Sequence, residues 1–280
     1  MPDAPGGPAA HGAPASPGAT ARGGSPVPPE GAFGRALVAG TARHWRSAGE
    51  AIELLDRPAF DPAAAVVGEA GLDGLRLLAP VVPGKVVAVG LNYRAHAAEL
   101  HMETAAEPIL FLKPATAVIG PGEPVVCPAR SMRVDYEAEL ALVVGRRCKD
   151  VAPAAAAAGV AGYTCGNDVT ARDLQKLDGQ WTRAKSFDTF CPLGPWIVPA
   201  TPRPGGRVSA LLDGVEVQVG LVGDMIVSPL ELLSFVSGVM TLEPGDVILT
   251  GTPPGVGQLA AGQTVSVVVE GVGRLDNPVA

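Results

Sequence analysis

The sequence predicts a β-rich α+β protein, and three observations support this fold class. Short apolar runs end at glycine or proline, as buried strands do between tight turns. This pattern dominates the second half of the chain, where helix-like stretches are few. With 280 residues, 47% of them apolar, the chain can build one large domain or a large domain with a small appendage.

Residues 1–32 are expected to form a disordered tail. The segment is rich in proline, glycine and alanine, so it buries too little apolar surface to offset the entropy lost on ordering. It also lacks the basic start and the continuous apolar stretch of a secretion signal. We therefore interpret it as an extension and not as a targeting sequence.

Residues 33–79 predict a small α+β domain. Residues 35–39 are typical of a strand, and residues 47–55 predict a short helix, because a serine is followed three residues later by a glutamate. Prolines and a glycine at positions 80, 83 and 84 then indicate a boundary. The predicted large domain covers residues 80–280.

The large domain begins with a strand and a helix that carries a polar pair. Residues 85–90 are typical of a buried strand, and residues 91–100 predict a helix. His96 and Glu99 are three residues apart on it, so they share a face and can form a hydrogen bond. The pair is either a general base with its orienting carboxylate or an ordinary polar pair on a surface helix, and these residues alone leave both readings open.

Two glutamates at the start of an apolar strand are the strongest chemical signal in the sequence. Glu137 and Glu139 are two positions apart, so their side chains point to one face of a strand. If they are exposed, water separates the two charges. If they are buried, one must take a proton or a cation must lie between them.

A third carboxylate follows about thirty residues later. Residues 161–167 predict a mostly apolar strand, and Asp168 follows it, where its carboxylate could join Glu137 and Glu139. The set consists of carboxylates alone, without a Cys or His. Hard oxygen ligands in this number suit Mg²⁺, Mn²⁺ or Ca²⁺ better than Zn²⁺.

Two further segments have unusual composition. Residues 181–196 are dense in aromatic, charged and turn residues, and Lys185 is either partly buried there, which requires a partner, or is a solvated loop lysine. Residues 250–253 form a Thr-Gly-Thr-Pro loop whose backbone can approach a ligand closely. The later Gly255 and Gly257 lack the context of a dinucleotide-binding fingerprint.

Composition excludes several classes of protein. The net charge of −7 argues against a nucleic-acid partner, which requires a basic face. No apolar run reaches the ~20 residues of a membrane-spanning helix. The four cysteines lie far apart without a C-x-x-C pair, which favours a reduced, cytoplasmic protein.

Five segments in order resemble the fumarylacetoacetate hydrolase family. They are residues 89–93 with His96 and Glu99, 135–140, 166–175, 184–189 and 249–253. The resemblance spans about residues 81–279, and five motifs in the same order are far more specific than any one of them.

The resemblance implies a rolled mixed β-sandwich and a set of functional residues. It implies a homodimer that binds Mg²⁺ or Mn²⁺ and acts on a small 2-oxo or 2,4-dioxo acid. The implied metal ligands are Glu137, Glu139 and Asp168; the implied catalytic residues are His96 and Glu99 on a lid helix with Lys185; the implied substrate contacts are Gln175, Thr252 and, more weakly, Arg172.

The expected function is metal-dependent hydrolysis of a C–C bond in an acylpyruvate-type acid through an enolate. An oxaloacetate-type decarboxylase or an enol–keto isomerase of a hydroxymuconate-like diacid uses the same electron sink, so the motifs do not choose between them. A catalytically silent binding protein is the remaining alternative. Many relatives carry a glycine at Ser186, a hydroxyl residue near Val222 and an aspartate at Gln263, and none of these departures touches the implied metal ligands.

Overall fold

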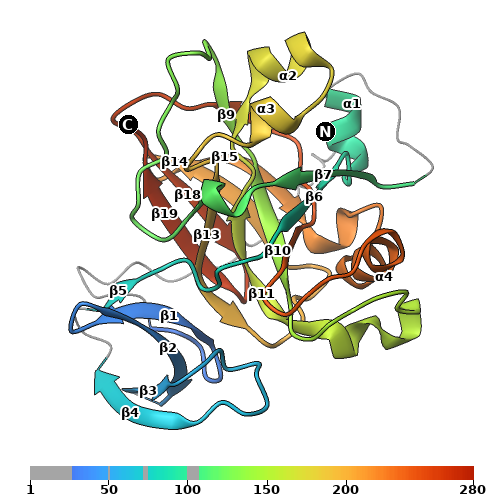
Figure 1. The fold of residues 1–280 in the computed structure, drawn as a ribbon. Helices are drawn as coiled ribbons and strands as arrows, with labels where there is room; N and C mark the ends of the chain where they lie inside the picture. Colours follow the sequence, from blue (N-terminus) through green and yellow to red (C-terminus); the bar gives the residue numbers. More distant parts are fainter. Residues whose placement is uncertain (1–26, 50, 72–74, 100–106) are drawn as a thin grey trace, which may run out of the picture.

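The computed structural model describes residues 27–49, 51–71, 75–99 and 107–280 (Figure 1). The disorder predicted for the tail therefore lies outside the described residues for positions 1–26. Among the described residues, no helix is long and apolar enough to cross a membrane.

The largest sheet has twelve strands and runs through the whole molecule. It is mixed, because β6 pairs in parallel with β16 and β8 in parallel with β13, whereas its other pairs are antiparallel. Its main path contains, in order, β4 (Val66–Gly71), β3 (Ala51–Leu55), β2 (Thr41–Ala48), β1 (Phe33–Val38), β13 (Cys191–Val198), β11 (Val160–Asn167), β10 (Ala138–Val144), β16 (Val247–Leu249), β6 (Val86–Gly90) and β7 (Ile109–Lys113). Off this path lie β5 (Arg76–Leu77), paired with β1, and β8 (Val118–Ile119), paired with β13.

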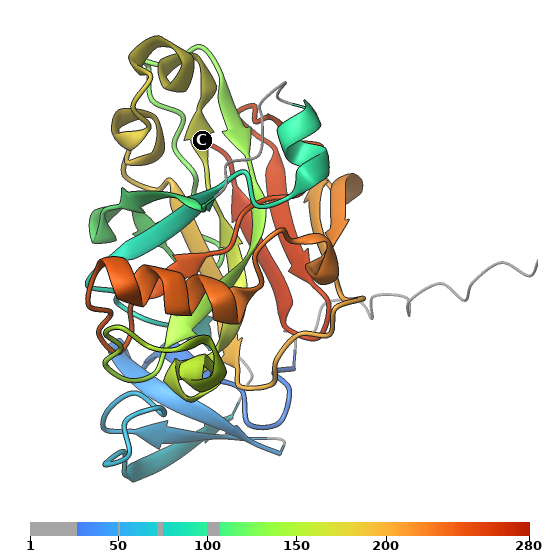
Figure 2. The same cartoon turned by 90° about the vertical axis from the view of Figure 1, so that its right-hand side faces the viewer.

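Two smaller sheets complete the roll. The four-stranded sheet contains, in order, β15 (Val215–Leu221), β14 (Arg207–Leu212), β18 (Thr264–Val269) and β19 (Gly273–Pro278). The three-stranded sheet contains β12 (Thr170–Ala171), β9 (Val134–Tyr136) and β17 (Gly257–Gln258). Strands β11 and β13 of the large sheet pack against β18 and β19, which makes the β-sandwich layers seen in Figure 2.

Helices are few and short in the described residues. The α-helices are α1 (Arg94–Glu99), α2 (Arg172–Asp178), α3 (Thr182–Lys185) and α4 (Pro229–Val239). The 3₁₀ helices span Ala115–Ala117, Pro153–Gly159 and Val222–Asp224. In Figure 1, α1, α2 and α3 lie at one end of the molecule, whereas α4 lies along its side.

The N-terminal strands correct one prediction. Residues 47–49 and 51–55 do not form the predicted helix: they contribute the end of β2 and all of β3, and the described part of residues 33–79 contains strands and no helix. The serine and glutamate of the apparent capping box flank Gly49, whose φ of +67° allows a tight turn between the two strands. Trp45 and Ile52 are buried in the core on either side of this turn. The expected α+β appendage is therefore a β-meander in its described part.

The meander continues the large sheet, because Phe33 on β1 pairs with Ile197 on β13. Figure 1 shows β1 to β4 as a lobe at one end of the molecule, away from α1 to α3. The division into residues 1–32, 33–79 and 80–280 stays a prediction.

Strand β10 forms the centre of the molecule. Leu140 and Leu142 lie in one apolar cluster, whereas Ala141 and Val143 lie in another, so both faces of the strand are buried. This explains its nearly continuous apolar sequence. Polar chemistry is therefore confined to the start of the strand.

Candidate active site

Strands β9, β10 and β11 bring three carboxylates together. Glu137 lies between β9 and β10, and Ala138 pairs with Asn167 at the end of β11, so Asp168 follows directly opposite. The backbone N–H of Asp168 donates to the carbonyl of Glu137 at 2.9 Å, and the Asn167 side-chain oxygen accepts from the Glu137 N–H at 3.0 Å. These hydrogen bonds hold the two carboxylate-bearing segments in register.

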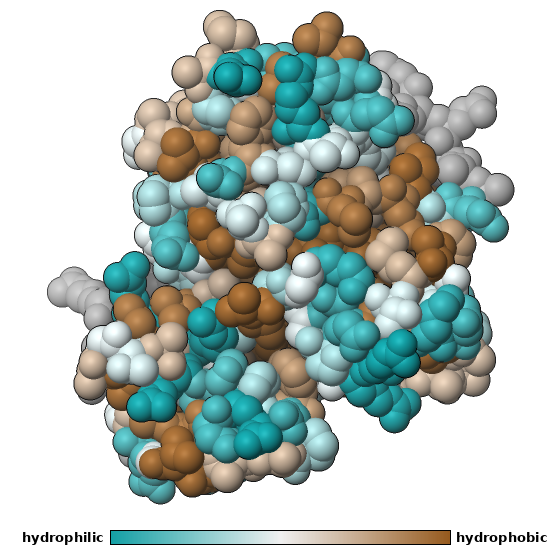
Figure 3. All heavy atoms as spheres, viewed as in Figure 1, coloured by the Kyte–Doolittle hydropathy of each residue, from teal (hydrophilic) through white to brown (hydrophobic). Residues whose placement is uncertain are grey.

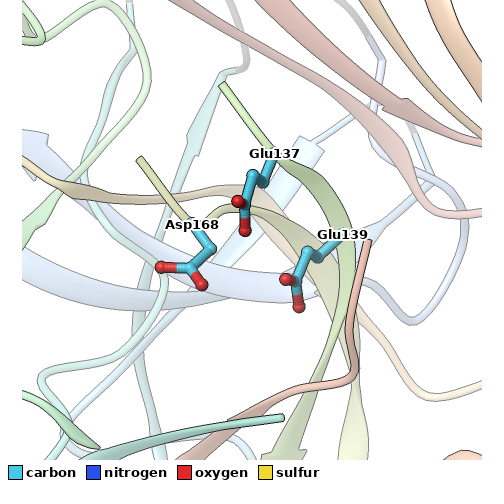
Figure 4. Close-up of side chains that lie close together, drawn as sticks. All are labelled: Glu137, Glu139 and Asp168. Carbon is cyan, nitrogen blue, oxygen red and sulfur yellow. The ribbon is translucent and has the colours of Figure 1, made fainter. Parts of the chain in front are cut away.

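The carboxylates of Glu137, Glu139 and Asp168 converge on one point (Figure 4). Their ligand atoms all lie within 4.8 Å of one another, and the three residues are only 4%, 1% and 1% exposed. The prediction that the two glutamates share a face is confirmed. The alternative of an exposed strand edge with solvated glutamates is wrong, because the whole set is buried.

Two lysines lie against these carboxylates. Lys185, at the end of α3, donates to Glu137 Oε2 at 2.8 Å and to Asp168 Oδ2 at 2.6 Å. Lys113, at the end of β7, donates to Asp168 Oδ1 at 2.6 Å and to the Val169 carbonyl at 3.3 Å. Lys185 is therefore a buried, paired lysine and not a solvated loop residue.

Sequence reasoning did not find Lys113. It ends an apolar strand just before a proline, where a lysine normally reaches solvent, yet its residue is only 1% exposed. The available signal was a charged residue at the end of an apolar run that closes at a proline. Its partner Asp168 is 55 residues away, so no local spacing indicated the contact.

The pKa values of the two glutamates shift in opposite directions. Burial alone would raise the pKa of Glu137, but the charges of Lys185 and Arg172 outweigh burial and hold it well below its usual range. Burial raises the pKa of Glu139 well above its usual range, and the negative charges of Asp168 and Glu137 raise it further. Paired with cations, Glu137 stays ionised, whereas Glu139 favours a proton.

Arg172, the first residue of α2, binds acids on β9 and before β10. It donates to Asp135 Oδ2 at 2.9 Å, to Gln175 Oε1 at 2.7 Å, and to Glu137 through a short contact. Burial would lower its pKa, but Glu137 and Asp135 raise it. All three of these hydrogen bonds join Arg172 to other side chains of the protein. The bond to Gln175 orients that side chain, which lines the cavity described below.

The predicted pair on α1 is formed. His96 Nδ1 lies 2.9 Å from Glu99 Oε2, and the other Glu99 oxygen accepts from the backbone N–H of Gly255 at 3.0 Å. His96 is buried, at 4% exposure, whereas the Glu99 side chain is 36% exposed, so the histidine is withdrawn from solvent and its partner lies at the surface. The hydrogen bond at Nδ1 leaves Nε2 available to act as a base.

One cavity of about 300 Å³ brings the predicted residues together. Its lining includes all of them except Glu99, which reaches the site through His96: His96, Glu137, Glu139, Asp168, Arg172, Gln175, Lys185 and Thr252. Phe111 and Trp181 form an apolar part of the cavity wall, with ring centroids 5.2 Å apart in an edge-on arrangement. Lys185 Nζ lies 5.1 Å from the Phe111 ring centre, where a cation–π contact adds to its ion pairs.

The residues fit a divalent cation. Glu139 is buried and accepts a hydrogen bond from the Gly251 N–H at 2.7 Å, but no ion pair joins it to a described lysine, arginine or histidine. A buried carboxylate without a cation is costly, and its raised pKa reflects this. Three convergent carboxylates meet the preference of Mg²⁺ or Mn²⁺ for oxygen ligands.

Comparison with known proteins identifies the family of this chain. Residues 85–280 match the family described as "Fumarylacetoacetate (FAA) hydrolase C-terminal", so the chain belongs to the fumarylacetoacetate hydrolase family. The family resemblance and the β-rich fold inferred from the sequence are thus confirmed.

Three similar proteins illustrate the range of the family. A protein of Archaeoglobus fulgidus is 52% identical over 209 residues, which is 75% of this chain and 84% of that protein. The crystal structure of a 2-hydroxyhepta-2,4-diene-1,7-dioate isomerase from Mycobacterium marinum is 42% identical, has a TM-score of 0.81, and is matched over 89% of this chain and 98% of its own. A fumarylpyruvate hydrolase from Pseudomonas aeruginosa, in complex with Mn²⁺ and pyruvate, is 32% identical, has a TM-score of 0.67, and is matched over 71% and 90%.

Proposed function

We propose that this protein is a metal-dependent hydrolase that cleaves a C–C bond in a 2,4-dioxo acid of the acylpyruvate type. The observation that carries this proposal is the position of His96, whose Nδ1 is held by Glu99 while its side chain lines the same cavity as the three carboxylates. Cleavage by water requires a base beside the electron sink, whereas decarboxylation does not. The comparison with the fumarylpyruvate hydrolase supports the same reading.

In the proposed reaction, His96 Nε2 takes a proton from water, and the resulting hydroxide attacks the 4-oxo carbon. The C3–C4 bond then breaks, its electron pair passes into the enolate of the 2-oxo acid, and the acyl group leaves as a carboxylic acid. Return of the proton to C3 completes pyruvate. Glu99 keeps the imidazole in the tautomer that has a free Nε2 and stabilises its charged form.

In this proposal, Lys185 stabilises the negative charge that develops on the enolate oxygen. Its ammonium group is buried against Glu137 and Asp168, and these ion pairs raise its pKa even though burial alone would lower it. A fixed positive charge at a developing enolate oxygen is often worth about 3 kcal/mol of transition-state stabilisation. A Mg²⁺ or Mn²⁺ ion held by Glu137, Glu139 and Asp168 would supply Lewis-acid polarisation of the 2-oxo group.

A decarboxylase or an isomerase is the alternative function. The similarity to a 2-hydroxyhepta-2,4-diene-1,7-dioate isomerase favours it, because that protein shares the fold at a higher identity than the fumarylpyruvate hydrolase. An isomerase needs a proton carrier such as His96 but no attacking water. A silent binding protein remains as a third hypothesis, and it has no need for a buried acidic cluster that requires a cation.

Product analysis with acetylpyruvate and oxaloacetate, offered separately with Mg²⁺, tests these functions. The hydrolase produces pyruvate and acetate from acetylpyruvate, and Asp168→Ala abolishes the reaction. His96→Asn should lower the hydrolytic rate by about 10²–10⁴-fold, because it removes the general base. Pyruvate and CO₂ from oxaloacetate alone would instead support the decarboxylase. Metal binding without either product would support an isomerase, and a protein that binds no Mg²⁺ would support the silent scaffold.

The setting of this function is also part of the proposal. We place the protein in the cytoplasm, because the cysteines are free in the structure and a reducing compartment keeps them so. The physiological form would be a homodimer, as the family resemblance implies. Neither nucleic acid nor membrane is an expected partner of a chain with a net charge of −7.

A further inference from the structure

One buried glutamine connects an edge strand to the site. Gln218 lies on β15, the edge strand of the four-stranded sheet, and is only 2% exposed. Its neighbours Val217 and Val219 point to the other face of the strand and are 38% and 42% exposed. Gln218 is therefore a buried polar residue on a strand that otherwise faces outward, and such a residue must be fully hydrogen-bonded.

The Gln218 amide makes three hydrogen bonds, to Thr252 in the cavity wall and to the backbone of two residues beside the site. Its Oε1 accepts from the backbone N–H of Ala138 at 3.0 Å, and its Nε2 donates to Thr252 Oγ1 and to the Pro253 carbonyl, both at 2.7 Å. Reversing the amide would place two donors together at Ala138 and two acceptors together at Pro253. The network therefore sets the orientation of the side chain.

These contacts constrain what Thr252 can do. Its hydroxyl donates its single proton to the Ala138 carbonyl at 2.8 Å and accepts from Gln218. A hydroxyl has only one proton, so in this arrangement Thr252 Oγ1 cannot also donate to an anionic substrate. The hydroxyl instead ties the loop that lines the cavity to the strand that carries the metal ligands.

Ala138 connects the hydrogen bonds of Gln218 and Thr252 to the proposed metal ligands. It lies between Glu137 and Glu139, and both its N–H and its carbonyl are engaged by the network. In addition, the N–H of Gly251, just before Thr252, donates to Glu139 Oε2. The loop and the strand are thus joined at the backbone and at one carboxylate.

We propose that Gln218 is a positioning residue that clamps the Thr252 loop to Ala138, and thereby sets the spacing of the metal carboxylates and of the cavity wall. The inference deepens the proposed function, because it concerns the same site. It assigns the Thr252 hydroxyl to the clamp and not to direct substrate recognition.

A double-mutant cycle tests the clamp with two probes, Mn²⁺ alone and pyruvate added to the Mn²⁺-loaded protein. Gln218→Met keeps the side-chain length without its hydrogen bonds, and Thr252→Val keeps the shape without the hydroxyl. Each change should weaken Mn²⁺ and pyruvate binding by about tenfold, as expected for the loss of buried hydrogen bonds. The double variant should be little worse than either single variant, because both break one unit.

Two control variants accompany the cycle. Thr252→Ser keeps both hydroxyl hydrogen bonds and should bind like the wild type. Val239→Thr changes an exposed side chain on α4, away from β15, and should also leave both affinities unchanged. Midpoints of thermal unfolding, measured for every variant, separate a local effect from a general loss of stability.

Several results would overturn the proposal. If Thr252→Val weakens pyruvate binding while Gln218→Met does not, the hydroxyl is a direct substrate ligand. If Gln218→Met lowers the unfolding midpoint without changing either affinity, the residue is only structural. Wild-type protein that binds Mn²⁺ but does not cleave acetylpyruvate would remove the proposed reaction while leaving the clamp testable, whereas wild-type protein that binds no Mn²⁺ would overturn both.

Discussion

At the scale of single residues, the site is a balance of buried charges. When all four buried carboxyl groups are ionised, they face three buried cations and leave one net negative charge: Asp135, Glu137, Glu139 and Asp168 against Lys113, Arg172 and Lys185. A divalent cation would change this balance to one net positive charge. An anionic 2-oxo acid would then be attracted to the loaded site.

Metal binding should become tighter as pH rises, because Glu139 has to lose its proton to bind a cation. Its pKa is raised by burial and by the charges of Asp168 and Glu137, so below that pKa each metal ion bound releases about one proton. Titration calorimetry with Mg²⁺ in buffers of different ionisation enthalpy measures this release. Glu139→Gln should remove the pH dependence and weaken binding, and an unchanged pH dependence in that variant would contradict the assignment.

The same carboxyl group should affect the stability of the metal-free protein. Because the pKa of Glu139 is raised in the folded state, its contribution to the free energy of unfolding is fully present below the unfolded value of about 4.3. That contribution is lost as pH rises through the folded pKa. Urea unfolding in the presence of a chelator should show a smaller loss with pH in Glu139→Gln, and an identical pH profile would count against the buried, protonated state.

At the scale of elements, the charged residues of the site lie at the ends of strands. Glu137 lies before β10, Asp168 after β11, and Lys113 at the end of β7. Strand ends are where a side chain can leave a buried sheet and still have its backbone fixed by the ladder. Elements far from the site contribute stability and should be separable from activity.

Helix α4 offers a clear case of such separation. Ser228 caps it: its Oγ accepts from the Glu231 N–H at 3.4 Å, and Glu231 Oε2 accepts from the Ser228 N–H at 2.9 Å. Ser228→Ala should lower the free energy of unfolding by about 1 kcal/mol, as measured by urea denaturation. Ser228→Thr keeps the cap and serves as the control. Turnover should not change in either variant, and a loss of activity in Ser228→Ala would show that α4 is coupled to the site.

Strand β6 approaches the aromatic wall at Gly90. A Cβ atom there would overlap the Trp181 ring, which packs edge-on against Phe111. Gly90→Ala should therefore displace the indole, cost about 1–3 kcal/mol of stability and raise the KM, because the ring lines the cavity. Trp181 fluorescence and steady-state kinetics measure the two effects. Gly205→Ala, where a Cβ meets nothing within 4 Å, is the matched control, and equal behaviour of the two variants would refute the packing argument.

At the scale of the whole molecule, apolar surface remains uncovered. Figure 3 shows apolar side chains gathered across the middle of one face, between the helices α2 and α3 and the N-terminal strands. Strand β15 carries a second set on a sheet edge, formed by side chains that are 38–65% exposed: Val215, Val217, Val219 and Leu221. An apolar edge strand with unpaired backbone groups is a ready site for strand pairing.

We expect a second copy of the chain to cover the β15 edge, because strand pairing across a two-fold axis closes both edges at once. The double change Val217→Glu and Val219→Glu should convert a dimer into a monomer by placing like charges across the axis. Light scattering after size-exclusion chromatography measures the mass. Val239→Glu, at an exposed position on α4, is the control and should not change it. A wild-type monomer, or a double variant that stays dimeric, would exclude this interface.

Local patterns in the sequence determined much of this protein. A period of two residues placed Glu137 and Glu139 on one face, and a spacing of three residues placed His96 beside Glu99, because strand and helix geometry are encoded over a few positions. The apparent capping box at residues 47–50 shows the limit of such patterns, because it was overridden when β2 and β3 paired as a hairpin. Propensity is weak compared with the burial of Trp45 and Ile52.

Only the tertiary structure decided which distant groups complete the site. Lys113 meets Asp168 across 55 residues of chain, and Gln218 meets Ala138 across 80. Neither residue stands out in the sequence, since a lysine or a glutamine at a strand position is normally solvated. Their importance arises from burial, which removes water from the polar groups and makes each hydrogen-bond partner necessary. Burial of these two residues depends on how the sheets pack, and the local periodicity of the sequence does not reveal it.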